Sequence, residues 1–302
     1  MYPLKRLMVC LDHSDLDNTL IEYTSWLAEK LGSESVYFVH VSKRFEYPKN
    51  FKEKFPEMVI PGDEVIKNEI EENVNVRFKN DVKLNVEVRE GNFTETIMRF
   101  IELKQVDLII VGKRNDMGSA GYNARRIANM ASCSVMFVPE RAVGKSDKVF
   151  VPVNFSDLSA MSLQLAGEIS EPDDSIVLQN IYKVPNGYRY SGKSFDEFAQ
   201  VMKKHSEEEY AKFLSTNNLD GSRYEIDFTL VEVGKSSDGI FKYLVKISPD
   251  LLILGSRGRT SAASFILGST AVGLLRPDNK VPFIIVKQKG QNMDIFGAFR
   301  EF

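Results

Sequence analysis

The sequence predicts an α/β protein built from two tandem domains, each with a five-stranded, mostly parallel sheet and helices on both faces. Its 302 residues are about twice the length of a typical domain of roughly 150 residues. The apolar segment LMVCLDHSD at 7–15 matches VFVPVNFSD at 149–157, and VDLIIVG at 106–112 matches PDLLILG at 249–255. The two pairs are offset by 142 and 143 residues, so one internal repeat explains both.

Each copy starts with an apolar strand, continues into an amphipathic helix and returns to a second apolar strand. In the first copy the helix is predicted over Thr19–Leu31, with apolar residues gathered on one face. The second strands are predicted at Val36–Val41 and Ile176–Ile181. Strands that alternate with helices in this way are typical of a parallel sheet covered by helices.

The rest of each copy repeats a second series of elements. A polar loop (42–64 and 183–194) precedes a charged helix, which in the second copy spans Phe195–Leu214. A third strand, another helix and the strand that ends in glycine follow. The third and last strands are predicted near 84–88 and 224–231, and at Ser134–Val138 and Phe283–Val286. The polar segment Glu140–Asp147 reads as a linker, which gives domains at 1–143 and 144–302.

Composition and charge argue against several function classes. A net charge of −3 provides no basic field for a nucleic acid. The sequence contains no run of about 18 apolar residues, which is the length needed to span a membrane. The first apolar segment reaches Asp12 too soon for a secretion signal. Cys10 and Cys133 lie in apolar strands and are predicted to be buried thiols, which points to a reducing cytoplasm.

The segment after the strand ending at Gly255 carries the clearest chemical signal. In an open parallel sheet, ligands bind beyond the carboxyl ends of the strands. Here the sequence follows the pattern G-x2-G-x9-G-[ST], formed by Gly255, Gly258, Gly268, Ser269 and Thr270. Glycines let the backbone approach phosphates, and a helix predicted over Ser269–Arg276 would present the N–H groups of Gly268, Ser269 and Thr270 to an anion. We therefore predict a phosphate-binding loop in the second copy.

This pattern, at the end of the fourth strand of a five-stranded unit, resembles the ATP-binding type of the universal stress protein family. The resemblance covers both halves and includes the Asp/Asn-x-Ser after each first strand, the loops at Gly91 and Gly234, and ASCSV at 131–135. It implies a Rossmann-like fold of the adenine-nucleotide alpha hydrolase type, with ATP, accompanied by Mg²⁺, as ligand. It also implies that the two halves pair through their last strands, so that one chain imitates a homodimer; a homodimer of whole chains stays open.

The resemblance also assigns residues in the second copy. Those implied to hold the phosphates are Gly258, Gly268, Ser269 and Thr270. Those implied to line the adenosine pocket are Pro152, Ile181, Leu254 and Gly255. Arg257, in the same loop, is either a further phosphate ligand or a solvated side chain. The family's acidic residue after the first strand falls on Asn154, which keeps a carbonyl acceptor but lacks the charge.

The first copy departs from this pattern. Its outer glycines, Gly112 and Gly121, enclose 8 residues where the second copy has 12. Asn115 replaces the middle glycine, and Tyr122 replaces the serine. Although Asp12 keeps the acid, the shortened loop and the bulky phenol predict that only the second domain binds ATP.

Other candidate residues carry weaker signals. His13 and His40 are expected at strand ends of the first copy and His205 in a charged helix, with no spacing typical of a metal site. Ser14 and Ser156 follow strand ends, but no histidine is placed to activate Ser156. The run Glu207–Glu209 reads as a solvated helix face. The tail at 292–302 spaces apolar residues at helical intervals and is expected to dock on its own chain or on a partner.

We predict a cytoplasmic, ATP-binding regulatory module of the stress response, with no catalytic residue and at most slow ATP hydrolysis, because no general base is evident. Two alternatives stay open: a ligand-free interaction scaffold, and an ATP-using enzyme on a related α/β sheet. Such enzymes carry His-x-Gly-His or Ser-Gly-Gly-x-Asp-Ser after the first strand. Neither DHSD at 12–15 nor NFSD at 154–157 matches them.

Overall fold

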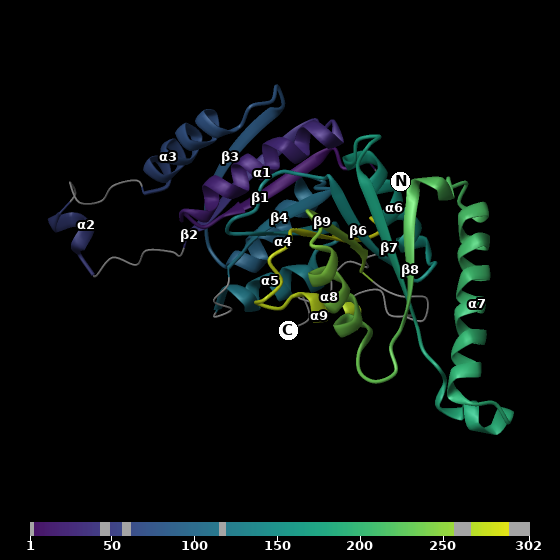
Figure 1. Cartoon of the computed structure of the whole chain (residues 1–302). Helices are drawn as coiled ribbons and strands as arrows, with labels where there is room; N and C mark the ends of the chain where they lie inside the picture. The colour runs from purple at the N-terminus through teal and green to yellow at the C-terminus, as the bar shows by residue number, and fades with distance from the viewer. Residues whose placement is uncertain (1–2, 43–48, 56–61, 115–118, 257–266, 290–302) are drawn as a thin grey trace. The chain divides into compact units, whose positions relative to one another are not determined.

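The structure is a computed structural model that describes residues 3–42, 49–55, 62–114, 119–256 and 267–289 (Figure 1). It forms two compact units. The first domain contains Pro3–Arg114 and Gly118–Gly144, and the second begins at Lys145.

The first domain is one parallel sheet with strand order β3-β2-β1-β4-β5. Its strands are β1 (Arg6–Leu11), β2 (Ser35–Ser42), β3 (Lys83–Glu90), β4 (Leu108–Lys113) and β5 (Ser134–Pro139). Its helices are α1 (Leu16–Leu31), α2 (Phe51–Lys54), α3 (Gly62–Arg77), α4 (Phe93–Leu103) and α5 (Ser119–Met130).

The second domain repeats this order as β8-β7-β6-β9-β10, again with parallel strands. Its strands are β6 (Lys148–Val153), β7 (Ser175–Tyr182), β8 (Tyr224–Leu230), β9 (Leu251–Gly255) and β10 (Phe283–Val286). Its helices are α6 (Asp157–Ile169), α7 (Phe195–Thr216), α8 (Ser236–Ile247) and α9 (Ser269–Leu274), with 3₁₀ turns η2 (Asn186–Ser191) and η3 (Gly221–Arg223). The predicted fold class, with two tandem α/β domains, is confirmed.

The strand order explains why helices cover both faces of each sheet. The chain moves outward from β1 to β3 and then crosses to β4 and β5 on the other side. Right-handed crossovers place the helices of these two directions on opposite faces. Accordingly α1 contacts α3, and α4 contacts α5. Because both faces are covered, the central strands are almost continuously apolar, and Leu7, Met8 and Val9 of β1 are fully buried.

Several boundaries differ from the sequence prediction, most of the strands by one or two residues. Helix α1 begins at Leu16 rather than at Thr19, since the Asp17 carboxylate accepts N–H groups from the preceding turn. Helix α9 ends at Leu274 rather than at Arg276, because the residue before Pro277 is disfavoured in the α conformation. The loops predicted at 42–64 and 183–194 contain α2 and η2, respectively.

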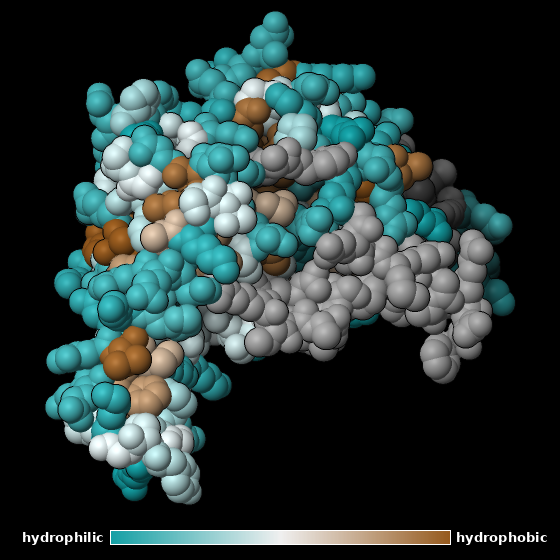
Figure 2. All heavy atoms as spheres, turned by 90° about the vertical axis from the view of Figure 1, so that its right-hand side faces the viewer, coloured by the Kyte–Doolittle hydropathy of each residue, from teal (hydrophilic) through white to brown (hydrophobic). Residues whose placement is uncertain are grey.

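The remaining structural expectations concern the surface and the cysteines. The side of the molecule that carries α7 is largely hydrophilic, with small separate apolar groups (Figure 2). Glu207 and Glu208 are exposed there and pair with lysines one turn earlier, as predicted for a solvated helix face. Cys10 and Cys133 are buried, unbridged thiols, also as predicted. No helix in the described ranges has the length and apolar character of a membrane span. The tail at 292–302 lies outside them.

Candidate functional site

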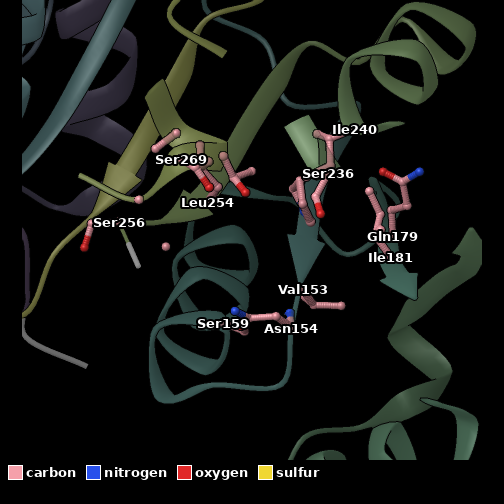
Figure 3. Close-up of a pocket in the computed structure, with 15 residues that line it drawn as sticks. Val153, Asn154, Ser159, Gln179, Ile181, Ser236, Ile240, Leu254, Ser256 and Ser269 are labelled. Carbon is pink, nitrogen blue, oxygen red and sulfur yellow. The ribbon is translucent and has the colours of Figure 1, made fainter. Parts of the chain in front are cut away.

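A pocket of about 260 Å³ lies in the second domain at the carboxyl ends of β6, β7 and β9 (Figure 3). Eight of the ten residues predicted for the nucleotide site line it: Pro152, Asn154, Ile181, Leu254, Gly255, Gly268, Ser269 and Thr270. The other two, Arg257 and Gly258, fall outside the described residues. The eight described members of the predicted set therefore converge on one place, although they come from three separate segments of the chain.

Seven lining residues were not predicted: Val153, Ser159, Gln179, Ser236, Ile240, Ser256 and Ala271. Gln179 could have been found, because it precedes Ile181 by two residues and alternate strand residues share a face. Ser236 and Ile240 belong to α8, which follows the Gly234 loop. The backbone of Gly234 has φ +101, a value that favours glycine and that turns the chain from β8 into α8. No simple sequence signal indicated that α8 would cover the pocket.

The turn after β6 fixes the side chain of Asn154. Its Oδ1 accepts hydrogen bonds from the Ser159 hydroxyl at 2.8 Å and from the Ser156 N–H at 3.3 Å. The following residue, Phe155, has left-handed backbone with φ +61, and Ser156 caps α6 by accepting the N–H of Ser159. The hydroxyl of Ser156 thus has a structural partner at the helix start.

The opposite end of the pocket is formed by the start of α9. Gly268 is the N-cap residue, and its N–H donates to the Ser256 carbonyl at 2.7 Å, so the expectation that this amide is available to an anion is wrong. The N–H groups of Ser269 and Thr270 lie in the first turn, where a helix offers no internal acceptor, and the N-cap residue Gly268 has no side chain to cap them. Because α9 has only six residues, individual N–H and O–H donors count for more here than a helix dipole.

The wall between these ends combines apolar and uncharged polar side chains. Ile181, Ile240 and Leu254 provide apolar surface, and Gln179 is 1% exposed. Among the described residues that line the pocket there is no carboxylate, imidazole or amine. The pocket can therefore supply hydrogen bonds and apolar contacts, but its described part supplies no charged side chain.

The equivalent edge of the first domain is built from charged groups. Asp12 accepts a hydrogen bond from Arg114 Nη2 at 2.9 Å. Asp17, at the position of Ser159, is buried and accepts the N–H groups of Asp12 and His13 at 3.1 and 2.9 Å. Burial, with a smaller contribution from the charge of Asp12, raises the pKa of Asp17 to about 6.

The predicted histidines lie where the sequence placed them. The Nδ1 of His40 is 3.1 Å from the Leu11 carbonyl, which can only accept, so this nitrogen carries a proton. Burial lowers the pKa of His40. His13 Nε2 lies 2.8 Å from a carboxylate oxygen of Glu69 in α3, and His205 is exposed on α7. Within the described ranges, no three His, Cys, Asp or Glu side chains form a group that could hold a metal ion.

The glycine loop of the first domain follows a different backbone path. Helix α5 begins at Ser119, so Gly121 and Tyr122 lie inside the helix, whereas Gly268 precedes α9. Gly112 packs so tightly on α1 that a Cβ there would lie 2.5 Å from Leu16 Cδ2. Asn115 lies outside the described residues. In the first domain the last glycine of the loop therefore lies inside a helix, whereas in the second domain it lies immediately before one.

Comparison with known proteins agrees with this architecture. A family model described as the universal stress protein family matches residues 3–139 and 145–287. A universal stress protein of Methanocaldococcus jannaschii is 24% identical over 160 residues, which cover 47% of this chain and 95% of that protein. The crystal structure of a universal stress protein from Archaeoglobus fulgidus has the same fold, with a TM-score of 0.62, 17% identity, and coverage of 95% of this chain and 97% of that chain. A functionally unknown protein from Pseudomonas aeruginosa gives a TM-score of 0.63 at 13% identity, covering 95% of this chain and 94% of that one. The two matches of the family model span nearly the whole chain, which therefore belongs, as its sequence motifs predicted, to the universal stress protein family.

Proposed function

We propose that the second domain binds ATP, as its magnesium complex, and that the protein is a cytoplasmic, nucleotide-binding regulatory module of the stress response. The observation that carries the proposal is the convergence of eight predicted residues on one pocket at the carboxyl ends of the strands. This edge of a parallel sheet is where α/β proteins bind their ligands.

The two ends of the pocket suit the two ends of a nucleotide. Ser269 and Thr270 offer N–H and O–H donors for phosphate oxygens, and Ile181 and Leu254 offer apolar surface for a purine ring. The volume of about 260 Å³ suits the nucleoside part, with the phosphates extending toward the glycine loop. Mg²⁺ typically keeps several waters and binds phosphate oxygens, so the lack of carboxylates among the described lining residues is compatible with a metal held through the nucleotide.

The composition of the pocket favours binding over hydrolysis. A general base must lie within hydrogen-bond reach of the attacking water. The uncharged side chains that line the described part of the pocket include none that is basic enough for this role. We therefore propose at most slow turnover of bound ATP.

The first test is to denature freshly purified protein and identify any released nucleotide by mass spectrometry. The second is thermal unfolding with and without MgATP. At a concentration 100 times the Kd, a ligand stabilises the native state by about 2.7 kcal/mol, which raises the melting temperature of a domain of this size by roughly 5–11 °C. If no nucleotide were released and MgATP did not raise the melting temperature, the proposal would be contradicted. The alternative function, a ligand-free interaction scaffold, would then be favoured.

Two glycine variants sharpen this test. Gly268→Val adds bulk where α9 begins and is expected to abolish the shift. Gly187→Val introduces the same side chain in the exposed η2 turn, where the new Cβ meets only an ordinary contact of 3.7 Å with Tyr190, and is expected to keep it. If MgATP raised the melting temperature of the two variants equally, Gly268 would not be part of the binding site.

Stoichiometry tests the asymmetry between the two domains. Because Gly121 and Tyr122 lie inside α5, whereas Gly268 precedes α9, isothermal titration is expected to give one ATP per chain. A stoichiometry of two would contradict this part of the proposal.

A further inference from the structure

Gln179 presents a buried oxygen for which the structure offers no partner. Its side chain lines the pocket and is 1% exposed. The amide nitrogen Nε2 donates to Thr229 Oγ1 at 2.8 Å. The amide oxygen Oε1 is fully buried and has no hydrogen-bond partner among the described residues. Most buried polar atoms are hydrogen-bonded, so an exception in a pocket wall calls for an explanation.

A chain of hydrogen bonds fixes which end of this amide faces the pocket. The Asp227 carboxylate can only accept, and the Thr229 hydroxyl donates its single proton to it. The Thr229 oxygen is then left to accept from Gln179, so Nε2 points toward β8 and Oε1 points away from it. In Figure 3 the oxygen of Gln179 is on the side of Ser236 and Ile240, and the nitrogen is on the opposite side. The amide oxygen therefore faces Ser236 and Ile240 on the pocket wall, where it is itself buried, so a ligand donor meets it only after these neighbouring side chains move apart.

The amide is not required by the fold. In the sheet register, Gln179 lies opposite Pro152 of β6, and its counterpart in the first domain is Val39, which lies opposite Cys10 of β1. Val39 is completely buried. The same backbone position thus packs well with an apolar side chain. The buried amide therefore distinguishes the second domain from the first at this position, and in the second domain it lies in the wall of the pocket.

The position of the acceptor restricts what can reach it. Strand β6 lies between β9, which leads to the donors of α9, and β7, which carries Gln179, so the two ends are two strand spacings apart, roughly 10 Å. An anionic phosphate would be repelled by Oε1 and attracted by the donors of Ser269 and Thr270. The other end of the ligand must then carry a hydrogen-bond donor.

We propose that Gln179 accepts a hydrogen bond from the exocyclic 6-amino group of adenine and makes the site selective for 6-aminopurine nucleotides over purines with a 6-oxo group or with hydrogen at C6. This inference rests on the proposed nucleotide function. An oxo group would bring a second acceptor against Oε1, and hydrogen at C6 would leave Oε1 unsatisfied.

The test combines removal of the ligand's amino group with removal of the protein's acceptor. Isothermal titration compares MgATP, the triphosphate of purine riboside, which lacks the 6-amino group, and inosine triphosphate, which carries a 6-oxo group. Wild-type protein is expected to bind MgATP roughly 10-fold more tightly than either analogue. Gln179→Met, of similar length but without an acceptor, is expected to bind all three alike. Gln200→Met makes the same change on the exposed face of α7 and is expected to keep the wild-type ratio.

A second variant leaves Gln179 in place. Thr229→Val removes the hydroxyl that holds the amide nitrogen, so the amide is free to turn and present either end. We expect the preference for MgATP over inosine triphosphate to fall severalfold. This variant answers the question if Gln179→Met fails to fold.

The outcomes separate this inference from the proposed function. If MgATP binds but the ratios are unchanged in Gln179→Met and Thr229→Val, the inference is overturned and the nucleotide function stands. If wild-type protein binds none of the three nucleotides, both are overturned. If Gln179→Met instead removes a difference between MgATP and its 2′-deoxy analogue, the acceptor contacts the ribose, and base selection by Gln179 is overturned.

Discussion

Gly273 is the position at which a single added methyl group should destabilise the second domain. It lies in α9 and faces α8, and a Cβ built on it would be 2.4 Å from the Cβ of Ser237. Favourable contacts between carbon atoms lie at about 3.5–4.0 Å, so Gly273→Ala requires the two helices to separate by roughly 1 Å. Ser237 cannot swing away, because its Cβ is fixed to the backbone of α8.

Two opposing terms set the magnitude for Gly273→Ala. Overpacking typically destabilises by about 1–3 kcal/mol. The higher helix propensity of alanine offsets at most about 1 kcal/mol of this, and less at the end of a short helix. Gly167 provides the matched control, since it is exposed in α6 and a Cβ there would meet nothing within 4 Å. Gly167→Ala should therefore stabilise by about 0.5–1 kcal/mol.

The assay is thermal unfolding of the two variants and the wild type, followed through the transition of the second domain. With about 2–4 °C per kcal/mol for a domain of this size, the two variants should differ by roughly 4–8 °C, with Gly273→Ala below and Gly167→Ala above the wild type. The double variant Gly273→Ala, Ser237→Gly should recover part of the loss. If Gly273→Ala were as stable as Gly167→Ala, the close packing of α8 on α9 would be refuted.

Three further predictions concern other parts of the chain. The pKa of Asp17 is raised in the native state, so between pH 4 and 6 the native carboxyl keeps a proton that the unfolded chain has lost. The free energy of unfolding of the first domain therefore falls as the pH rises through this range, by on the order of 2–3 kcal/mol in total. Asp17→Ser, the residue of the second domain, should remove that slope in urea unfolding measured at several pH values; an unchanged slope would assign it to other groups. Burial raises the pKa of the Cys10 thiol, so labelling by a thiol reagent should be negligible in native protein and rapid in urea, and fast native labelling would contradict its burial. Ser194→Ala breaks the capping box of α7 and should lower stability by about 1 kcal/mol, whereas Ser194→Gly should lower it by only a few tenths; equal losses would mean that the hydroxyl is not the cap.

The sequence predicted the fold almost completely because both halves repeat one strongly patterned series. The apolar strands β4 and β9, which contain Gly112 and Gly255, are buried on both faces, and such runs are easily recognised. The errors lie at helix ends. The N-terminal end of α1 depends on the buried carboxylate of Asp17, and the C-terminal end of α9 depends on Pro277, so local hydrogen bonds and the proline ring outweigh the hydrophobic pattern there.

The site residues that belong to the glycine and hydroxyl motif were predicted from the sequence. The site residues that only the tertiary structure brings to the pocket were missed. Ser236 and Ile240 reach the pocket only because α8 folds over β7, which no local motif indicates. The role of the Gly268 amide was misjudged for a related reason, since its acceptor, the Ser256 carbonyl, is twelve residues away in the sequence. Gln179 was missed although it lies two residues before Ile181 on the same face of β7, and its unsatisfied amide oxygen becomes evident only when its neighbour Thr229 on β8 is known.

In each domain a side chain of the second strand forms a hydrogen bond with a backbone carbonyl at the end of the first strand. The type of side chain differs between the two domains. His40 binds the Leu11 carbonyl in one, and Asn180 donates to the Val153 carbonyl at 2.9 Å in the other. The equivalent backbone positions therefore accept either an imidazole or a carboxamide, as expected of a duplicated segment whose copies have diverged under different demands. It follows that the strand segments at 36–41 and 176–181 could be exchanged between the two domains. Such chimeric proteins would carry the side chains of one second strand in the sheet of the other domain.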